Sequence, residues 1–140
     1  MRIVLDTDVV VAALRSPAGG SAAVLRAIRR GSATMLASVP LMIEYEAICQ
    51  LAVHRRAAQL DAASVAIFLD AIAALSEPVE THFRWRPQLR DPGDEMVLET
   101  AVNGRASAVV TFNSRDYGSI PSTFGIDVWT PGQTLSRIGT

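Results

Sequence analysis

The chain has 140 residues, of which 49% are hydrophobic and 19% charged, and its net charge at pH 7 is −1. This length suits one ordinary domain, so we expect a single domain over residues 1–140. The composition excludes a disordered chain, and the single cysteine, Cys49, excludes a disulfide framework and fits a reducing cytoplasm. The net charge offers no overall attraction for a polyanion, so nucleic-acid binding would depend on local patches.

All 13 basic residues are arginine, which excludes lysine nucleophiles, Schiff bases and P-loops. Residues 1–14 are mostly apolar, but Asp6 and Asp8 interrupt them, which neither a signal-peptide core nor a membrane span would tolerate. We therefore expect a soluble, cytoplasmic protein that does not enter a membrane.

Short β-rich runs and longer runs with helical spacing alternate along the chain. The predicted strands are residues 2–5, 34–38, 79–81, 106–111 and 126–129. The predicted helices are residues 21–30, 40–53, 61–76, 94–103 and 131–138. Ser21 and either Asp61 or Ser64 are candidate N-caps, Pro78 is expected to stop a helix, and residues 7–15 predict only a short apolar turn.

This alternation predicts a three-layer α/β/α sandwich with a central parallel sheet. In such sheets, ligands bind near the carboxyl ends of the strands. Three positions are expected there: Asp6 follows the first strand, Asp94 opens a helix, and residues 113–116 follow a late strand. Asp94 lies on the apolar stripe of its helix, although a role as a simple N-cap is the alternative.

A further acid lies within the helix predicted over 40–53. Glu44 shares a face with Leu41 and Ile48, and Glu46 shares a face with Met42 and Cys49. Helical spacing alone therefore does not decide which glutamate faces inward.

Carboxylates that converge without a histidine cluster favour hard cations such as Mg²⁺ or Mn²⁺ over zinc. His54 and His82 stand alone in the sequence and are interpreted as solvated or structural. Such cations support hydrolysis of a phosphodiester by water, with no protein nucleophile.

Four segments in order resemble the successive blocks of PIN domains. They are Val4-Leu5-Asp6-Thr7-Asp8-Val9, Leu41-Met42-Ile43-Glu44-Tyr45-Glu46, Arg90-Asp91-Pro92-Gly93-Asp94-Glu95-Met96-Val97-Leu98-Glu99 and Val109-Val110-Thr111. Their order and spacing are most similar to those of PIN proteins identified as toxin components of bacterial toxin–antitoxin systems.

The resemblance implies a metal-dependent endoribonuclease with Asp6, Glu44 and Asp94 as metal ligands, and it selects Glu44 over Glu46. It places Thr7 or Asp8 nearby, with Asp8 where the family often has asparagine. It also implies an RNA substrate, a small antitoxin partner and a homodimer.

The chain departs from the family pattern after Val110-Thr111. The family supplies a fourth acid there, whereas this chain has Asn113. Asn113 and Asp116 are therefore both candidate catalytic residues for the fourth position: the Asn113 amide oxygen can coordinate or position water, and Asp116 is the candidate substitute as metal ligand.

Two groups of arginines are candidate RNA contacts, with solvated surface as the alternative. They are Arg26, Arg29 and Arg30, and Arg84, Arg86 and Arg90 around Trp85. The Ala- and Leu-rich residues 60–75 are a candidate dimer or antitoxin interface, with core packing as the alternative.

Two rival functions follow from the same residues. One is a PIN-fold module that binds partners without cleavage, because the fourth acid position is weakened. The other is a haloacid-dehalogenase-like phosphohydrolase, since Asp6-Thr7-Asp8 resembles its nucleophile motif; the lack of lysine counts against it.

Overall fold

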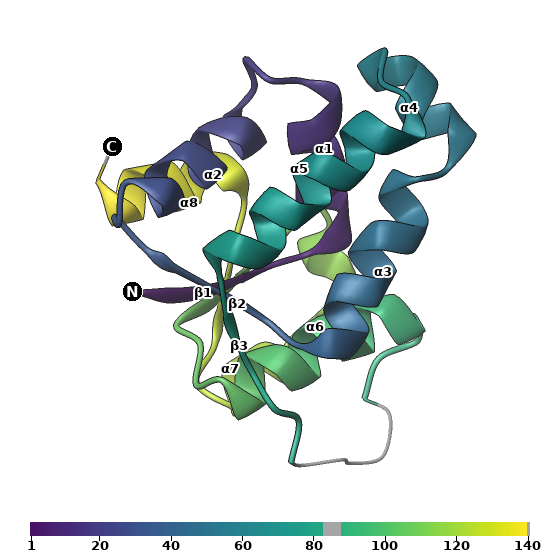
Figure 1. The fold of residues 1–140 in the computed structure, drawn as a ribbon. Helices are drawn as coiled ribbons and strands as arrows, with labels where there is room; N and C mark the ends of the chain where they lie inside the picture. Colours follow the sequence, from purple (N-terminus) through teal and green to yellow (C-terminus); the bar gives the residue numbers. More distant parts are fainter. Residues whose placement is uncertain (83–87, 140) are drawn as a thin grey trace.

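The computed structural model describes residues 1–82 and 88–139 and contains a five-stranded, all-parallel sheet (Figure 1). The strand order is β3-β2-β1-β4-β5. The strands are β1 (Arg2–Leu5), β2 (Thr34–Ala37), β3 (Ser76–Pro78), β4 (Ala108–Val110) and β5 (Asp127–Trp129).

Helices cover both faces of this sheet, with α2, α5 and α8 on one side and α6 and α7 on the other (Figure 1). The predicted α/β/α sandwich with a central parallel sheet is therefore confirmed. The α-helices are α1 (Thr7–Arg15), α2 (Gly20–Arg29), α3 (Val39–Cys49), α4 (Ala52–Ala58), α5 (Ala62–Leu75), α6 (Pro92–Asn103), α7 (Ile120–Thr123) and α8 (Pro131–Ile138). A 3₁₀ turn, η1 (Ser114–Asp116), follows β4.

The central strand β1 and the neighbouring strand β4 are deeply buried. Ile3, Val4 and Leu5 have no exposed surface, and neither do Val109 and Val110. Complete burial of such side chains contributes about 1.5–3 kcal/mol each, and strands covered on both faces are apolar throughout. The residues that follow these two strands are therefore attached to a deeply buried part of the fold.

The prediction of a turn over residues 7–15 is wrong, because these residues form α1. Asp6 caps the helix by accepting from the Thr7 backbone N–H at 2.7 Å. Val9, Val10 and Leu14 then pack into the core at helical spacing. The two aspartates at the start of this segment obscure its apolar periodicity in the sequence.

The helix predicted over 40–53 is two helices, α3 and α4. The chain leaves the helical conformation at Leu51, where φ is −61° and ψ is 138°. The Gln50 side chain donates to the Ala62 carbonyl at 3.0 Å and ties this break to the start of α5. The break turns α4 toward α1, against which it packs.

Smaller differences concern where elements begin and end. The third strand is 76–78 rather than 79–81, and Pro78, expected to stop a helix, lies in it. Proline is tolerated there because β3 is an edge strand. Gly19, not Ser21, is the N-cap of α2, because Ser21 already lies inside the helix and is buried.

Side chains cap other helices too, and for α5 the cap is the predicted Asp61 rather than Ser64. Ser38 caps α3, Asp61 caps α5, and Thr130 caps α8 through a capping box with Gln133. Among the described residues, no single helix is long and apolar enough to span a membrane; α4 and α5 meet that criterion of length and composition only when joined across an 89° bend.

Candidate active site

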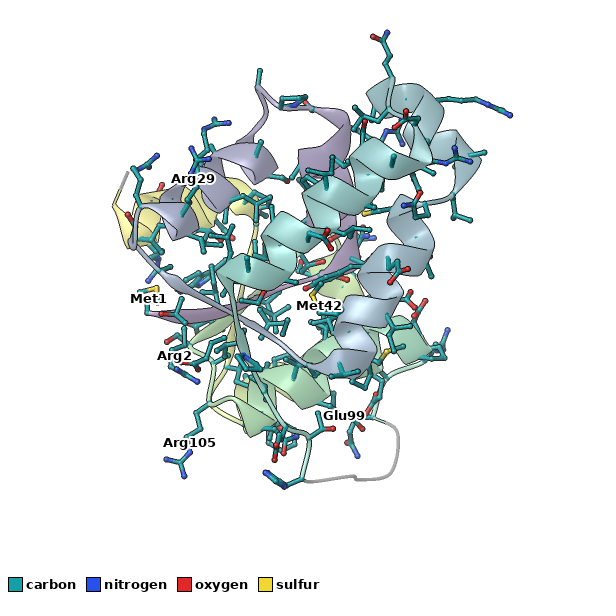
Figure 2. The ribbon with its side chains drawn as sticks, in the orientation of Figure 1. Met1, Arg2, Arg29, Met42, Glu99 and Arg105 are labelled. Atoms are coloured by element: carbon teal, nitrogen blue, oxygen red, sulfur yellow. The ribbon has the colours of Figure 1, made fainter. Side chains whose placement is uncertain are left out.

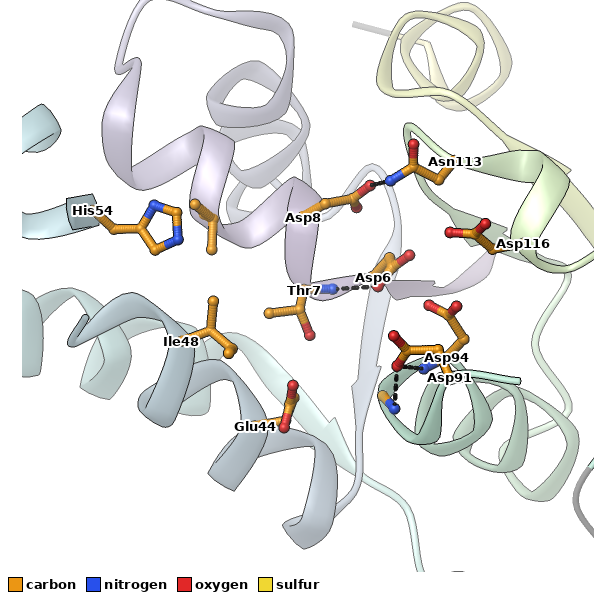
Figure 3. A pocket seen from close by; sticks show the side chains of 12 residues that line it. Asp6, Thr7, Asp8, Glu44, Ile48, His54, Asp91, Asp94, Asn113 and Asp116 are labelled. Carbon is orange, nitrogen blue, oxygen red and sulfur yellow. Dashed lines mark hydrogen bonds between the residues drawn. The ribbon is translucent and has the colours of Figure 1, made fainter. Parts of the chain in front are cut away.

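A hollow of about 380 Å³ opens beside the carboxyl ends of β1 and β4, between α1, α3 and α6 (Figure 3). We call it the acidic hollow because six carboxylates line it. Its lining residues are Asp6, Thr7, Asp8, Val11, Glu44, Ile48, His54, Asp91, Gly93, Asp94, Asn113 and Asp116. Every predicted site residue is in this set.

Asp6 is the most deeply set of these acids, with 7% of its surface exposed. Its Oδ1 accepts from the Thr7 N–H, and its Oδ2 accepts from the Thr111 hydroxyl at 2.8 Å. Burial raises the pKa of Asp6, while the hydrogen bond from Thr111 and the nearby Tyr117 hydroxyl lower it. The carboxylate is thus held by the first residue of α1 and by the residue that follows β4.

Asp8 lies in the first turn of α1 and lines the same hollow. Its Oδ2 accepts from the Phe112 backbone N–H at 3.1 Å and from the Asn113 amide at 3.2 Å. Its Oδ1 is buried and has no partner among the described residues. Burial and then repulsion from Asp6 raise the pKa of Asp8 to about 6. A buried oxygen without a donor is a position where a cation or water would be favourable.

Asp94 enters the hollow from the first turn of α6. The residue that caps α6 is Asp91, whose Oδ1 accepts from the Gly93 N–H at 2.7 Å and the Asp94 N–H at 3.4 Å. The alternative that Asp94 is merely a helix cap is therefore wrong. Burial, followed by repulsion from Asp6 and other acids, raises the pKa of Asp94 to about 7.

Glu44 projects into the hollow from α3, whereas Glu46 is exposed and lines a different groove between α3 and α5. The start of α6 lies close to this side chain, since a Cβ atom at Gly93 would be in van der Waals contact with Glu44 Oε1 at 3.4 Å. Of the two glutamates, Glu44 is therefore the one that faces the acidic hollow.

Asn113 and Asp116 both reach the hollow from the segment after β4 (Figure 3). The Asn113 amide is committed to Asp8, to which its Nδ2 donates. Asp116 raises the pKa of both Asp6 and Asp94 by repulsion, so its charge faces theirs. Of the two candidates for the fourth acid position, Asp116 therefore supplies the negative charge.

Two of the lining residues with ionisable side chains, His54 and Asp91, lie outside the predicted set. His54, interpreted from the sequence as solvated or structural, lines one end of the hollow, and its Nδ1 is 3.4 Å from Arg15 Nη1. Its placement depends on the break between α3 and α4, which the sequence does not reveal. Asp91 lies just before the helix predicted over 94–103, and an Asp-Pro pair before an apolar helix is a recognisable N-cap signal.

Two buried hydroxyl groups lie beside the acids of the hollow. Thr111, which has no exposed surface, donates to Asp6 and lies 3.3 Å from Asp8 Oδ2. Tyr117 is also fully buried, and its hydroxyl lowers the pKa of Asp6 and Asp94, yet no hydrogen bond of standard geometry joins it to a described residue. Periodicity in the sequence gives no sign of Tyr117, because it follows an irregular turn.

The donors in the hollow suit a hard divalent cation, since the acids and the Asn113 amide offer oxygen atoms. Within the described residues, no three His, Cys, Asp or Glu side chains converge closely enough to hold one ion. Mg²⁺ commonly keeps several waters and is held by one or two carboxylates, so this spacing is compatible with it.

Among the described residues, no arginine of the two predicted groups lines the acidic hollow. Arg26, Arg29 and Arg30 are exposed around the C-terminal end of α2, away from the hollow. Arg90 is exposed near α6, while Arg84, Trp85 and Arg86 lie outside the described residues.

The sheet, its acidic edge and the order of the acids define a nuclease-type α/β/α protein. Residues 2–115 match the PIN domain family, so the chain belongs to that family. Members of this family are generally nucleases that hydrolyse phosphodiester bonds and typically bind divalent metals. No curated protein and no solved structure matches the chain. Membership in the PIN family leaves the haloacid-dehalogenase alternative without support.

Proposed function

We propose that this protein is a divalent-metal-dependent endoribonuclease that hydrolyses RNA phosphodiester bonds. The observation that carries the proposal is the meeting of Asp6, Glu44, Asp94 and Asp116 around one hollow, from four separate elements of the chain. Burial and mutual repulsion raise the pKa of Asp6 and Asp94, which is the electrostatic condition that a bound cation relieves.

In this proposal Asp6, Glu44 and Asp94 hold the ion, which we take to be Mg²⁺ or Mn²⁺, one or two of them directly and the rest through waters that the ion keeps. Asp116 completes the acidic set with Asn113 beside it. When bound, such an ion lowers the pKa of a coordinated water and offsets the charge that develops on the phosphate. The chain itself contributes by orienting the acids of the hollow. Thr111 fixes Asp6, while the Phe112 N–H and the Asn113 amide fix Asp8.

Hydrolysis by water fits the absence of a competing nucleophile in the described part of the hollow. Cys49 is buried on α3 and does not line it, and burial raises the pKa of its thiol to about 11. Thr7 is the one hydroxyl-bearing residue of the lining, and no described basic side chain hydrogen-bonds to its hydroxyl. A covalent intermediate is therefore not part of the proposal.

The test is cleavage of a labelled RNA pool in Mg²⁺, Mn²⁺ or EDTA, with Asp6→Asn and Asp94→Asn beside the unaltered protein. We expect cleavage that requires metal and is lost in both variants. Equal cleavage by the variants would mean a contaminating nuclease and would contradict the proposal.

We further propose that the protein is the toxin of a toxin–antitoxin pair and acts as a homodimer. This rests on the family resemblance, with support from an apolar groove between α3 and α5. The groove includes Val39 and Ile43, which are 72% and 61% exposed. Exposed apolar side chains of this size are typical of protein contacts. Sedimentation tests the dimer, and growth arrest on expression, relieved by a protein encoded beside it, tests the toxin role.

A second candidate function is a PIN-fold module that binds RNA or protein without cleaving it. The observation that favours it is the lack, within the described residues, of three side chains close enough to hold one ion. Calorimetric titration with Mn²⁺ separates the two. Binding that disappears in Asp94→Asn supports the nuclease, and no binding at millimolar Mn²⁺ supports the silent module.

A further inference from the structure

A second hollow of about 540 Å³ adjoins the acidic hollow and shares Asp91, Asp94 and Asp116 with it. We call it the arginine hollow. Its other walls come from residues 88–90, just before α6, and from residues 115 and 117–120 around the end of η1. A ligand that crosses the wall formed by Asp94 and Asp116 would therefore pass from one hollow directly into the other.

The two hollows differ in charge. The acidic hollow has no arginine in its lining, whereas the second hollow contains Arg90 and Arg115. Both arginines are exposed, and neither forms an ion pair or hydrogen bond with another described residue. Their guanidinium groups therefore have donors available for a ligand, even though acids lie nearby.

We propose that Arg90 and Arg115 bind the RNA phosphate next to the one that is cleaved. This proposal rests on the proposed function. Six carboxylates repel an RNA backbone from the acidic hollow, and the net charge of −1 provides no general attraction. Two guanidinium groups on opposite walls of the adjoining hollow supply the local attraction, and their planar forks match phosphate oxygens.

Phosphate contacts position a strand and carry no base information. Arg90 and Arg115 are therefore substrate-positioning residues, and their removal should weaken binding of all RNA sequences alike. The alternative is that both are merely solvated surface charges. The two readings differ in the salt dependence of binding, because only a phosphate contact releases counterions.

The test measures anisotropy of a labelled single-stranded RNA 12-mer in Mg²⁺ over a range of salt, with all proteins in the Asp94→Asn background to prevent cleavage. Arg90→Gln and Arg115→Gln should each weaken binding by roughly fivefold, and the double variant should lower the slope of log K against log salt by about 0.7, the value of one single-strand phosphate. Arg115→Lys keeps the charge and should keep most of the slope.

The matched control is Arg29→Gln, an exposed arginine on α2 that lines neither hollow (Figure 2). It should leave affinity and slope unchanged. In the otherwise unaltered enzyme, Arg90→Gln and Arg115→Gln should raise KM with little change in kcat, since they act on a phosphate that does not react.

The outcomes separate this proposal from the proposed function. If the unaltered protein cleaves RNA with metal but the Arg90 and Arg115 variants bind and cleave like Arg29→Gln, the phosphate contact is wrong and the nuclease stands. If the unaltered protein neither binds nor cleaves RNA, both proposals are wrong. Thermal unfolding of each variant, compared with that of Arg29→Gln, shows whether weaker binding comes from loss of the fold.

Discussion

At the scale of single residues, the acids of the hollow differ in how the protein supports them. Asp6 and Asp8 receive hydrogen bonds from backbone and side-chain donors after β4. Glu44 lines the hollow from α3 with no hydrogen bond to another described residue. Its carboxylate is therefore available for a ligand, as the proposed function requires.

Glu44 and Glu46 provide a matched pair of variants on one helix. Glu44→Gln should lower metal-dependent RNA cleavage by about tenfold or more, because loss of a ligand should cost at least as much as loss of a group that supports one. Glu46→Gln should leave cleavage unchanged, because that side chain faces the groove between α3 and α5. Initial rates at several Mn²⁺ concentrations are the measurement, and equal effects of the two changes would contradict the assignment.

Thr111, which follows β4, hydrogen-bonds to the carboxylates of Asp6 and Asp8. Thr111→Val keeps the shape but removes the donor to Asp6, and should lower the free energy of unfolding by about 1–3 kcal/mol, the cost of a buried acceptor left without a partner. Thr111→Ser should retain most of the stability because it keeps the hydroxyl. Urea denaturation of both variants at one pH distinguishes them; equal stability of the Val and Ser variants would show that the bond contributes little.

At the scale of elements, the sequence predicts the sheet better than the connections. β1 and β4 are apolar runs buried on both faces. The sequence alone therefore predicts that Asp6 and the segment after Val110 lie at the same edge of the sheet. The helix α1 could not be predicted, because Asp6 and Asp8 obscure its apolar spacing. The break between α3 and α4 could not, because it depends on tertiary contacts. The role of Tyr117 could not be predicted for the same reason.

The start of α6 holds Asp94 in place, and Asp91 governs that start. Asp91→Ala should reduce the free energy of unfolding by about 1 kcal/mol through loss of the N-cap. Asp91→Asn should restore this stability, because an amide oxygen also accepts from the Gly93 N–H. Asparagine also removes a charge that raises the pKa of Asp94. The rate of RNA cleavage by Asp91→Asn therefore shows whether the charge of Asp91 affects catalysis. Thermal denaturation in EDTA is the first measurement, and equal loss in both variants would mean that the cap is not the cause.

At the scale of the whole molecule, the small net charge conceals an uneven distribution. Six carboxylates gather in the acidic hollow, and the arginines lie around it and on other faces. Concentrated like charge destabilises a folded chain unless protons or cations neutralise it. The stability of the whole protein should therefore report on the state of this one site.

Without a divalent metal, the protein should be more stable at pH 5 than at pH 8. The pKa of Asp8 is raised to about 6 and that of Asp94 to about 7 from an ordinary value of 3.8. The folded chain thus binds protons more tightly than the unfolded chain, and this stabilisation is lost as the pH rises through 6 and 7. The melting temperature in EDTA should fall by a few degrees between pH 5 and pH 8. Asp94→Asn should reduce this fall. Asp70→Asn, which changes an exposed acid on α5, should not reduce it.

Added Mg²⁺ should reverse the loss at pH 8, where the carboxylates are charged, and have little effect at pH 5, where protons occupy them. A ligand present at one hundred times its Kd adds about 2.7 kcal/mol to the free energy of unfolding. Melting curves with Mg²⁺ or EDTA at both pH values make this comparison. Stabilisation by Mg²⁺ that is equal at pH 5 and pH 8, or that persists in Asp94→Asn, would place the ion somewhere other than the acidic hollow.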